Sequence, residues 1–473
     1  MSAMSAVRGL QARNPAGSNA APRAAGDVLV RAGPSRFLGL DYGTSGARVT
    51  VIDEDANIVE EHKTSYDIQL GGKASPLAWQ RSLETLFGAV SKLSKDNLQS
   101  IAIDGTSGTA IIVGGNGTVL TPVAKMYNEP QAAGALDAVK AIAPSEHTVL
   151  SANSTLAKAF AFLMDVGIDR QSRDDSPGSP GSTSEWNLMH QADYIGYLLH
   201  RRIGHSDWNN TLKLGFDPAA ERYPPWLVAA DDVYGIVPKH VHAPGSPVSV
   251  IDPAVAEAFS VNKGCVVCAG TTDSIAAFLA AGVDSPGQAV TSLGSTMAIK
   301  LVSEHEVNSS EYGVYSHRLP GTWLVGGASN TGGAVLRQLF TDDEVAELTA
   351  RMDIDTPTNT DYVVLPAVGE LFPVRDPSLA PRLEPRPEDD AVFLQGIFEA
   401  MSRTEATAYG LLERLGATPV REIKTAGGGA RNDKWLALRR REIGLEAISA
   451  AEYGEASYGA ALLGKRGVAN LGA

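Results

Sequence analysis

Apolar and polar positions along the chain follow two different spacings. Apolar and β-branched runs predict strands at 37–52, 57–62 and 101–113. Apolar residues instead recur at helical spacing over 76–93 and 389–416. Because strand-like and helix-like stretches alternate in both halves, the pattern predicts an α/β protein with mixed sheets.

The strand pattern at 37–52 contains an unusual turn. An apolar run leads into Asp41, and a β-branched run leaves after a loop of small residues, which are Gly43, Thr44, Ser45 and Gly46. Glycine lets backbone N–H groups approach an anion closely, and the hydroxyls add donors. A bound Mg²⁺ would offset the repulsion between Asp41 and a phosphate. The pattern predicts a phosphate-binding β-hairpin, and an ordinary glycine-rich hairpin is the alternative.

A second, similar segment lies at 287–302. By linear alignment, its residues match those of the first segment as follows: Ser292 with Asp41, Gly294 with Gly43, Ser295 with Thr44, Thr296 with Ser45, and Ala298 with Ala47. Two related hairpins, one in each half, predict a duplicated fold that holds nucleotide phosphates between the halves. The acidic residue occurs in only one copy, so we expect the two sides of this cleft to differ chemically.

A third segment, 423–440, predicts a strand, a glycine-rich turn and an amphipathic helix. At the turn, Gly428 and Gly429 would let an adenine ring lie against bare backbone, with Asn432 near the helix start. A simple strand-to-helix turn is the alternative. The stretch 459–466 resembles a Walker A loop only superficially, because it lacks the required Ser or Thr and continues a helix-like pattern.

The segment 266–280 predicts a strand, a Gly-Thr-Thr turn and a helix that begins at Asp273. The helix dipole favours a carboxylate at this position, so a simple capping role is one interpretation. The other is catalytic: a carboxylate in a nucleotide cleft accepts a proton from a sugar hydroxyl as that hydroxyl attacks the γ-phosphorus.

Composition narrows the function classes. The chain has 473 residues, a net charge of −14 and 44% hydrophobic residues, which suggests two or three domains with sizeable cores. The negative charge argues against a general nucleic-acid binder, and no apolar run is long enough to span a membrane. Cys265 and Cys268 lie within an apparent strand and are expected to be buried thiols.

The N-terminal segment has a composition of its own. It contains four arginines and one acidic residue, Asp27, among many Ala, Ser and Gly residues. This composition predicts a chloroplast transit peptide over residues 1–35. A disordered tail on a cytoplasmic protein is the alternative.

The motifs Leu40–Gly46, Ala269–Ser274, Leu293–Thr296 and Ala426–Ala430 occur in the order found in FGGY-type carbohydrate kinases. The chain resembles that family over roughly residues 36–470. Within it, the segment 104–109 looks closest to plant and cyanobacterial D-ribulose kinases, which are also described as xylulose-kinase-like.

This resemblance implies two ribonuclease-H-like, actin-like ATPase domains around an interdomain cleft, with ATP and Mg²⁺ as cofactors. The sugar-binding domain would span 36–284 and the nucleotide-binding domain 285–473. The implied roles are a catalytic base for Asp273, Mg²⁺ and phosphate ordering for Asp41, γ-phosphate contact for Thr44, phosphate binding for Gly43, Ser45, Gly294, Ser295 and Thr296, and adenosine binding for Gly428, Gly429 and Asn432.

One departure affects the substrate. Many xylulose kinases carry a Met-His or Gln-His pair where this chain has Thr106 and Ser107. Ser107 is the candidate for a sugar-hydroxyl contact, and a plain turn residue is the alternative. We expect a monomer or homodimer that phosphorylates D-ribulose to D-ribulose 5-phosphate. A xylulose or polyol kinase and a non-catalytic ATP-binding scaffold are the other hypotheses.

Overall fold

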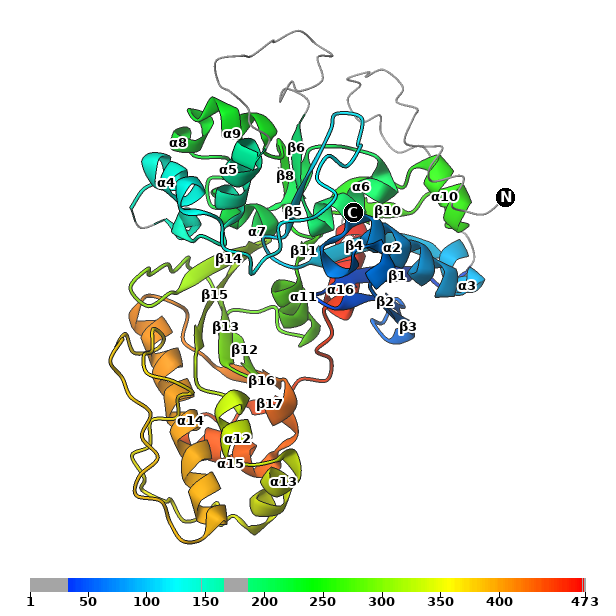
Figure 1. Ribbon diagram of the computed structural model, residues 1–473. Helices are drawn as coiled ribbons and strands as arrows, with labels where there is room; N and C mark the ends of the chain where they lie inside the picture. Colours follow the sequence, from blue (N-terminus) through cyan, green and yellow to red (C-terminus); the bar gives the residue numbers. More distant parts are fainter. Residues whose placement is uncertain (1–32, 146, 166–185, 470, 472–473) are drawn as a thin grey trace. The chain divides into compact units, whose positions relative to one another are not determined.

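A computed structural model describes residues 33–145, 147–165, 186–469 and 471. Residues 1–32 of the predicted transit peptide lie outside this range. The chain forms two compact units (Figure 1): the first contains the residues up to Ala280 and those from Glu455 onward, and the second contains Ala281–Gly454. The chain therefore leaves the first unit close to the expected boundary after residue 284.

The main sheet of the first unit has the strand order β3-β2-β1-β4-β10-β9, with β11 beside β4. Strands β1, β2 and β3 pair antiparallel, whereas β4 runs parallel to β1 and to β10. The strands are β1 (Arg36–Tyr42), β2 (Gly46–Ile52), β3 (Ile58–Ser65), β4 (Leu98–Gly105), β9 (Pro247–Val250), β10 (Val266–Cys268) and β11 (Thr271–Thr272). Leu38 and Leu40 on β1 are fully buried, whereas exposure alternates along the edge strand β3, because its successive side chains point to opposite faces of the sheet.

Helices pack on this sheet, and one of them comes from the far end of the chain. The helices are α2 (Pro76–Ala89), α3 (Lys92–Asp96), α6 (Gln191–His200), α10 (Pro253–Phe259), α11 (Asp273–Ala280) and α16 (Ala456–Ala469). Helix α16, red in Figure 1, contacts the N-terminal strands β1, β2 and β4. A Cβ atom at Gly39 would lie 1.9 Å from the Ser457 carbonyl oxygen, so only glycine allows this approach.

The position of α16 differs from the expected domain 285–473, because this last segment packs in the first unit. Helical periodicity identifies α16 as a helix but does not say which sheet its apolar face covers. Gly459 also lies within this helix, which confirms the rejection of a Walker A loop there.

The first unit also carries an insertion with its own apolar core, which includes Ala110, Leu156 and Val233. Strand β5 (Ala110–Val113) pairs with β6 (Asn187–His190), and β7 (His205–Asp207) pairs with β8 (His240–His242). Its helices are α4 (Ala133–Ile142), α5 (Thr155–Asp165), α7 (Trp208–Thr211), α8 (Pro225–Val228) and α9 (Asp231–Ile236).

The second unit repeats the strand arrangement of the first. Its sheet has the order β14-β15-β13-β12-β16-β17, with an antiparallel β12–β13 hairpin and with β16 parallel to β12. The strands are β12 (Gln288–Leu293), β13 (Met297–Ser303), β14 (Tyr315–Leu319), β15 (Thr322–Ser329), β16 (Glu422–Ala426) and β17 (Ile448–Ala450). The helices are α12 (Gly333–Leu339), α13 (Asp342–Arg351), α14 (Asp390–Arg414) and α15 (Asp433–Ile443).

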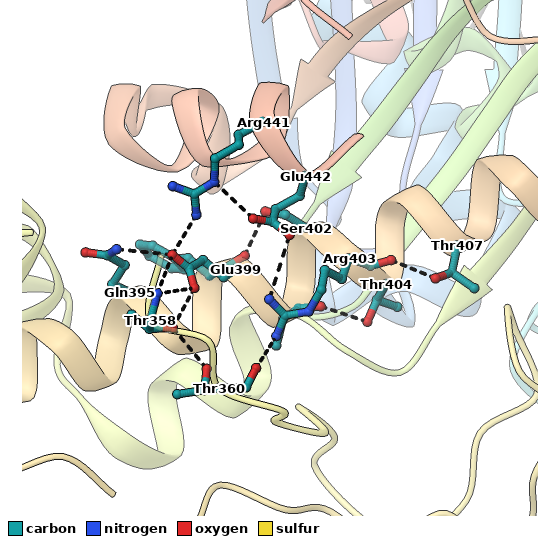
Figure 2. Close-up of polar contacts among 12 residues, drawn as sticks. Thr358, Thr360, Gln395, Glu399, Ser402, Arg403, Thr404, Thr407, Arg441 and Glu442 are labelled. Atoms are coloured by element: carbon teal, nitrogen blue, oxygen red, sulfur yellow. Dashed lines mark hydrogen bonds and ion pairs between the residues drawn. The ribbon is translucent and has the colours of Figure 1, made fainter. Parts of the chain in front are cut away.

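The long helix α14 confirms the apolar stripe expected over 389–416. It packs against α15, where the rings of Phe398 and Trp435 stack with centroids 4.4 Å apart. Figure 2 shows a polar cluster on the same pair of helices, where Glu399 accepts hydrogen bonds from Thr358 and pairs with Arg441 at 2.7 Å. The cluster ties the loop before α14 to both helices.

Two absences apply to the part of the chain that the structure describes. No helix within it combines the length and the apolar character that are needed to cross a membrane. Cys265 and Cys268 are free, buried thiols, as expected, and burial raises the pKa of Cys268 to about 12.

Candidate active site

The predicted first hairpin is present and ends in a short exposed turn. Strands β1 and β2 pair through Tyr42 and Ala47, and the Gly43 N–H donates to the Gly46 carbonyl at 3.1 Å. The side chains of Thr44 and Ser45 are exposed at the tip. This places the predicted phosphate-binding hydroxyls where an incoming anion can reach them.

Three carboxylates converge at one edge of the first sheet. Asp41 lies near the end of β1 and is the register partner of Asp104 near the end of β4. Thr271 of β11 is the next partner of Asp104, and Asp273 begins helix α11 two residues later. Because the carboxyl ends of parallel strands meet at the same sheet edge, residues far apart in sequence share one acidic site.

Burial and mutual repulsion control the protonation of these acids. Asp104 is fully buried, and neither of its carboxyl oxygens has a hydrogen-bond partner among the described residues. Burial, followed by repulsion from Asp41 and Asp273, raises its pKa well above the usual range. Burial also raises the pKa of Asp41, although the neighbouring Asp104 carboxyl partly offsets that effect. Burial and repulsion therefore favour the protonated form of the Asp104 carboxyl beside Asp41.

A cation from the insertion approaches Asp273. Lys213 lies in the short turn Leu212–Leu214, and burial lowers its pKa while the attraction of Asp273 opposes that change. Asn209 and Asn210 hold β11, the strand directly before Asp273. Their side-chain amides donate to the Thr271 hydroxyl at 3.0 Å and to the Thr271 carbonyl at 3.1 Å, respectively. An ammonium group and a carboxylate in one neighbourhood are suited to binding a polyhydroxy compound.

Sequence reasoning did not assign a role to Asp104 or Lys213. Asp104 follows the apolar run Ile101–Ile103 much as Asp41 follows its own strand, so a usable signal was present. Lys213 is 60 residues before Asp273, and nothing in the sequence connects them.

Ser107 lies in the loop between β4 and β5, next to the carboxylates. This acceptor loop, residues 106–109, is buried except at Ser107, which is half-buried. Lys158 supports it by donating to the Gly108 carbonyl at 2.8 Å. Within the first unit, the structure therefore brings Asp41, Ser107 and Asp273 to the same end of the sheet.

The second hairpin is also present, but its turn is shorter. Ser292 pairs with Ala298 and Leu293 with Met297, which leaves only residues 294–296 in the turn. In the first hairpin, the last pair is Tyr42 with Ala47, and residues 43–46 form the turn. The linear match of Ala298 to Ala47 is therefore wrong in the folded structure. Ala47 belongs to the last pair before the first turn, whereas Ala298 belongs to the second-to-last pair before the second turn.

Helix α12 holds this second turn. Backbone N–H groups of Gly333 and Ala334 donate to the carbonyls of Gly294 and Ser295 at 2.8 and 3.0 Å. Arg337 from the same helix donates to the Ser295 hydroxyl at 2.8 Å. An exposed guanidinium thus lies at the predicted phosphate turn, a contact that the sequence did not reveal.

The glycine turn after β16 lies beside the second hairpin. At Gly427 and Gly429, an added Cβ would come within 2.6 Å of the Leu293 carbonyl oxygen and 2.7 Å of the Trp435 ring. At Gly428, an added Cβ would meet nothing within 4 Å, so this residue presents an open backbone surface. Asn432 caps α15 by accepting from the Trp435 N–H at 2.9 Å.

A buried ion pair supports both strands of this region. The Arg439 guanidinium makes two 2.6 Å contacts with Glu405. Glu405 also accepts from Thr291 of β12, and Arg439 donates to Thr425 of β16. The pair fixes the strands that carry the second hairpin and the glycine turn.

The donor set of the first unit fits Mg²⁺ only together with other ligands. Carboxylate oxygens suit this hard cation, which commonly binds one or two carboxylates plus phosphates and water. Among the described residues, no three His, Cys, Asp or Glu side chains are placed to hold a metal by themselves. Asp41, which is partly exposed, would hold a cation that arrives with the nucleotide.

Comparisons with known proteins agree on the type of fold. No family model matches the chain. It is 26% identical to a ribulokinase from Halalkalibacterium halodurans over 57% of this chain, and the match spans 53% of that relative, about half its length. It is 18% identical to a xylulose kinase from Staphylococcus xylosus over 91% of this chain and 90% of the relative.

The solved structure of a xylulose kinase from Brucella ovis superimposes with a TM-score of 0.75 and 20% identity, covering 92% of this chain and 91% of the other. The fold is that of the FGGY-type carbohydrate kinases. The expected α/β class, with mixed sheets in two domains of actin-like fold, is confirmed. The FGGY-type kinases that match this chain include enzymes for different sugars. The substrate of this chain therefore has to be inferred from the residues of its own candidate site.

Proposed function

We propose that this protein is an ATP-dependent carbohydrate kinase that converts D-ribulose to D-ribulose 5-phosphate. The observation that carries the proposal is the convergence of Asp41, Asp104 and Asp273 at the sheet edge that also bears the first hairpin turn. The resemblance of segment 104–109 to D-ribulose kinases supports the choice of sugar.

In the proposed reaction, Asp273 accepts the proton of a sugar hydroxyl. The hydroxyl oxygen forms a bond to the γ-phosphorus of ATP, the bond from that phosphorus to the β,γ-bridging oxygen breaks, and ADP leaves. Mg²⁺ supplies positive charge that neutralises the phosphates. Asp41 orients the metal, Ser107 and Lys213 bind sugar oxygens, and the hydroxyls of Thr44 and Ser45 bind phosphate oxygens.

In the second unit, we assign phosphate binding to Gly294, Ser295 and Thr296, and adenosine binding to the turn that contains Gly428, Gly429 and Asn432. The open surface at Gly428 supports this assignment. Gly429 and Asn432 also have structural tasks, because one packs on Trp435 and the other caps α15.

The test is a substrate panel with coupled detection of ADP. Purified protein with MgATP is supplied with D-ribulose, L-ribulose, D-xylulose, the matching pentoses or glycerol. We expect the highest kcat/KM with D-ribulose. Preference for D-xylulose or glycerol would replace the substrate assignment, and ATP binding without sugar-stimulated ADP release would indicate a scaffold.

A further inference from the structure

A line of buried hydrogen bonds joins the acceptor loop to the first phosphate turn within the first unit. The Thr106 hydroxyl donates to Oε1 of Gln191 at 2.8 Å, and the Thr106 N–H donates to the same atom at 3.1 Å. Nε2 of Gln191 donates to the Tyr66 hydroxyl at 3.4 Å, which donates to the Gly43 carbonyl at 2.9 Å. We call Thr106, Gln191, Tyr66 and the Gly43 carbonyl the relay.

The hydrogen bonds of the relay all run in one direction, and the side chains that form them are buried from water. A backbone N–H can only donate, so Thr106 fixes Oε1 of Gln191 toward the loop and Nε2 toward Tyr66. Thr106, Gln191 and Tyr66 are 2%, 1% and 6% exposed, so water has little access to replace a broken bond. Burial, Asp41 and Asp104 raise the pKa of Tyr66, which keeps its hydroxyl a donor.

Tyr66 holds the phosphate turn at two points. Besides the hydroxyl bond to Gly43, its backbone N–H donates to the Ser45 carbonyl at 3.4 Å. A second route runs in parallel: the Tyr127 N–H donates to the Thr109 hydroxyl at 3.0 Å, and the Tyr127 hydroxyl accepts from Thr44 at 3.4 Å. Both routes begin in the acceptor loop and end in the turn Gly43–Ser45.

We propose that Gln191 and Tyr66 are positioning residues that couple sugar binding at the acceptor loop to the arrangement of the phosphate turn. The inference rests on the proposed function, because it assigns the sugar to this loop and phosphate to this turn. A sugar that orders residues 106–109 fixes Gln191, then Tyr66, then the Gly43 carbonyl. Coupling between sites is reciprocal, so the sugar tightens nucleotide binding by the factor by which the nucleotide tightens sugar binding.

The test measures that coupling without turnover. Isothermal titration calorimetry gives the Kd of Mg·AMP-PNP with and without saturating D-ribulose in wild type, Tyr66→Phe, Gln191→Met and the double variant. In wild type, we expect D-ribulose to lower the Kd about tenfold, within the usual range for coupled sites. Each single variant should lower this ratio to about threefold, because the parallel route through Tyr127 remains. The double variant should lower it no further, because Tyr66 and Gln191 belong to the same route.

Tyr458→Phe is the matched control. Its hydroxyl donates to the Ala56 carbonyl at 3.0 Å, and Tyr458 is 6% exposed, like Tyr66. It belongs to the same unit but lies outside the relay, so coupling should persist. Equal loss in Tyr458→Phe would mean that any buried hydroxyl matters, and undiminished coupling in Tyr66→Phe would mean that the relay transmits nothing. Either result overturns the proposal.

These outcomes separate the inference from the proposed function. If wild type forms no ADP with any sugar of the panel, the kinase assignment fails. If it phosphorylates D-ribulose but the sugar leaves the Kd of Mg·AMP-PNP unchanged, the relay is overturned and the kinase assignment stands. Should Gln191→Met fail to fold, Tyr66→Phe and its control decide the question alone.

Discussion

The two hairpins occupy the same place in the strand order of their sheets but differ in chemistry. In the first unit, the paired positions near the ends of β1 and β4 are Asp41 and Asp104. In the second, the corresponding pair on β12 and β16 is Ser292 and Ala426. One sheet edge therefore presents two acids where the other presents a hydroxyl and a methyl group.

The supports of the two turns differ in the same sense. Tyr66 and the polar residues of the relay hold the first turn, close to three carboxylates. The N-terminal N–H groups of α12 and the Arg337 guanidinium hold the second. The repeated fold thus fixes the positions of the two turns, whereas the surrounding side chains determine their chemistry. Acid–base and metal chemistry fit the first unit, and direct phosphate binding fits the second.

The largest effect is expected when the first unit loses its proposed catalytic base, Asp273. Asp273→Asn should lower kcat for D-ribulose phosphorylation by roughly 10²- to 10⁴-fold, because the amide cannot accept the hydroxyl proton. The Kd for Mg·AMP-PNP should stay within about twofold. The measurements are coupled ADP detection and calorimetry. Asp252→Asn, at the N-terminus of α10, is the control, and near wild-type turnover in Asp273→Asn would remove this residue from the mechanism.

A reciprocal exchange tests the comparison directly. Asp41→Ser gives the first hairpin the residue of the second, and it should lower kcat/KM for MgATP by roughly 10²-fold through loss of metal ordering. Ser292→Asp adds a charge beside the other phosphate turn and should weaken nucleotide binding about tenfold. Titration of Mg²⁺ against rate distinguishes the two, since only Asp41→Ser should change the metal requirement. Identical metal profiles would mean that the units share this role.

The first unit should also be the more acid-sensitive one. His200 is buried beside His205, His242, Arg201 and Arg202, and burial and these neighbours lower its pKa to about 3. The unfolded chain binds this proton near pH 6.5, so stability is present above that pH and falls as the pH decreases toward 3. The expected loss from His200 is about 1.4 kcal/mol per pH unit.

Denaturant unfolding at pH 7 and pH 5 measures this loss. His200→Asn should be less sensitive to acid than wild type, because asparagine has no proton to gain. His305→Asn replaces an exposed histidine of the second unit and should behave like wild type. Equal acid sensitivity in all three proteins would contradict the assignment.

The smallest effect concerns the second turn. Arg337→Ala should raise KM for MgATP about three- to tenfold with kcat nearly unchanged, because one charge-assisted contact to phosphate is lost. Initial-rate kinetics against MgATP measure this. Arg351→Ala removes an exposed pair with Asp389 on another helix of the same unit and should leave KM unchanged. A larger effect on kcat than on KM would instead place Arg337 in the reacting geometry.

Much of the fold could be predicted from local pattern. Both hairpins, the helix that begins at Asp273, the glycine turn and the long helix α14 have strong short-range signals, and the structure contains all of them. The second turn was harder, because register depends on cross-strand pairing and not on linear alignment. Ala298 therefore pairs one step away from the position expected from Ala47.

The sequence alone determined the α/β alternation, the two turns with their hydroxyls and the acid at the start of α11, because each depends on neighbours within one element. Only the tertiary structure decided that α16 returns to the first sheet, that Asp104 lies beside Asp41, and that the charge of Asp273 acts on Lys213. These contacts join residues 60 to more than 400 positions apart. Burial and strand register create them, and neither quantity is encoded in any short segment.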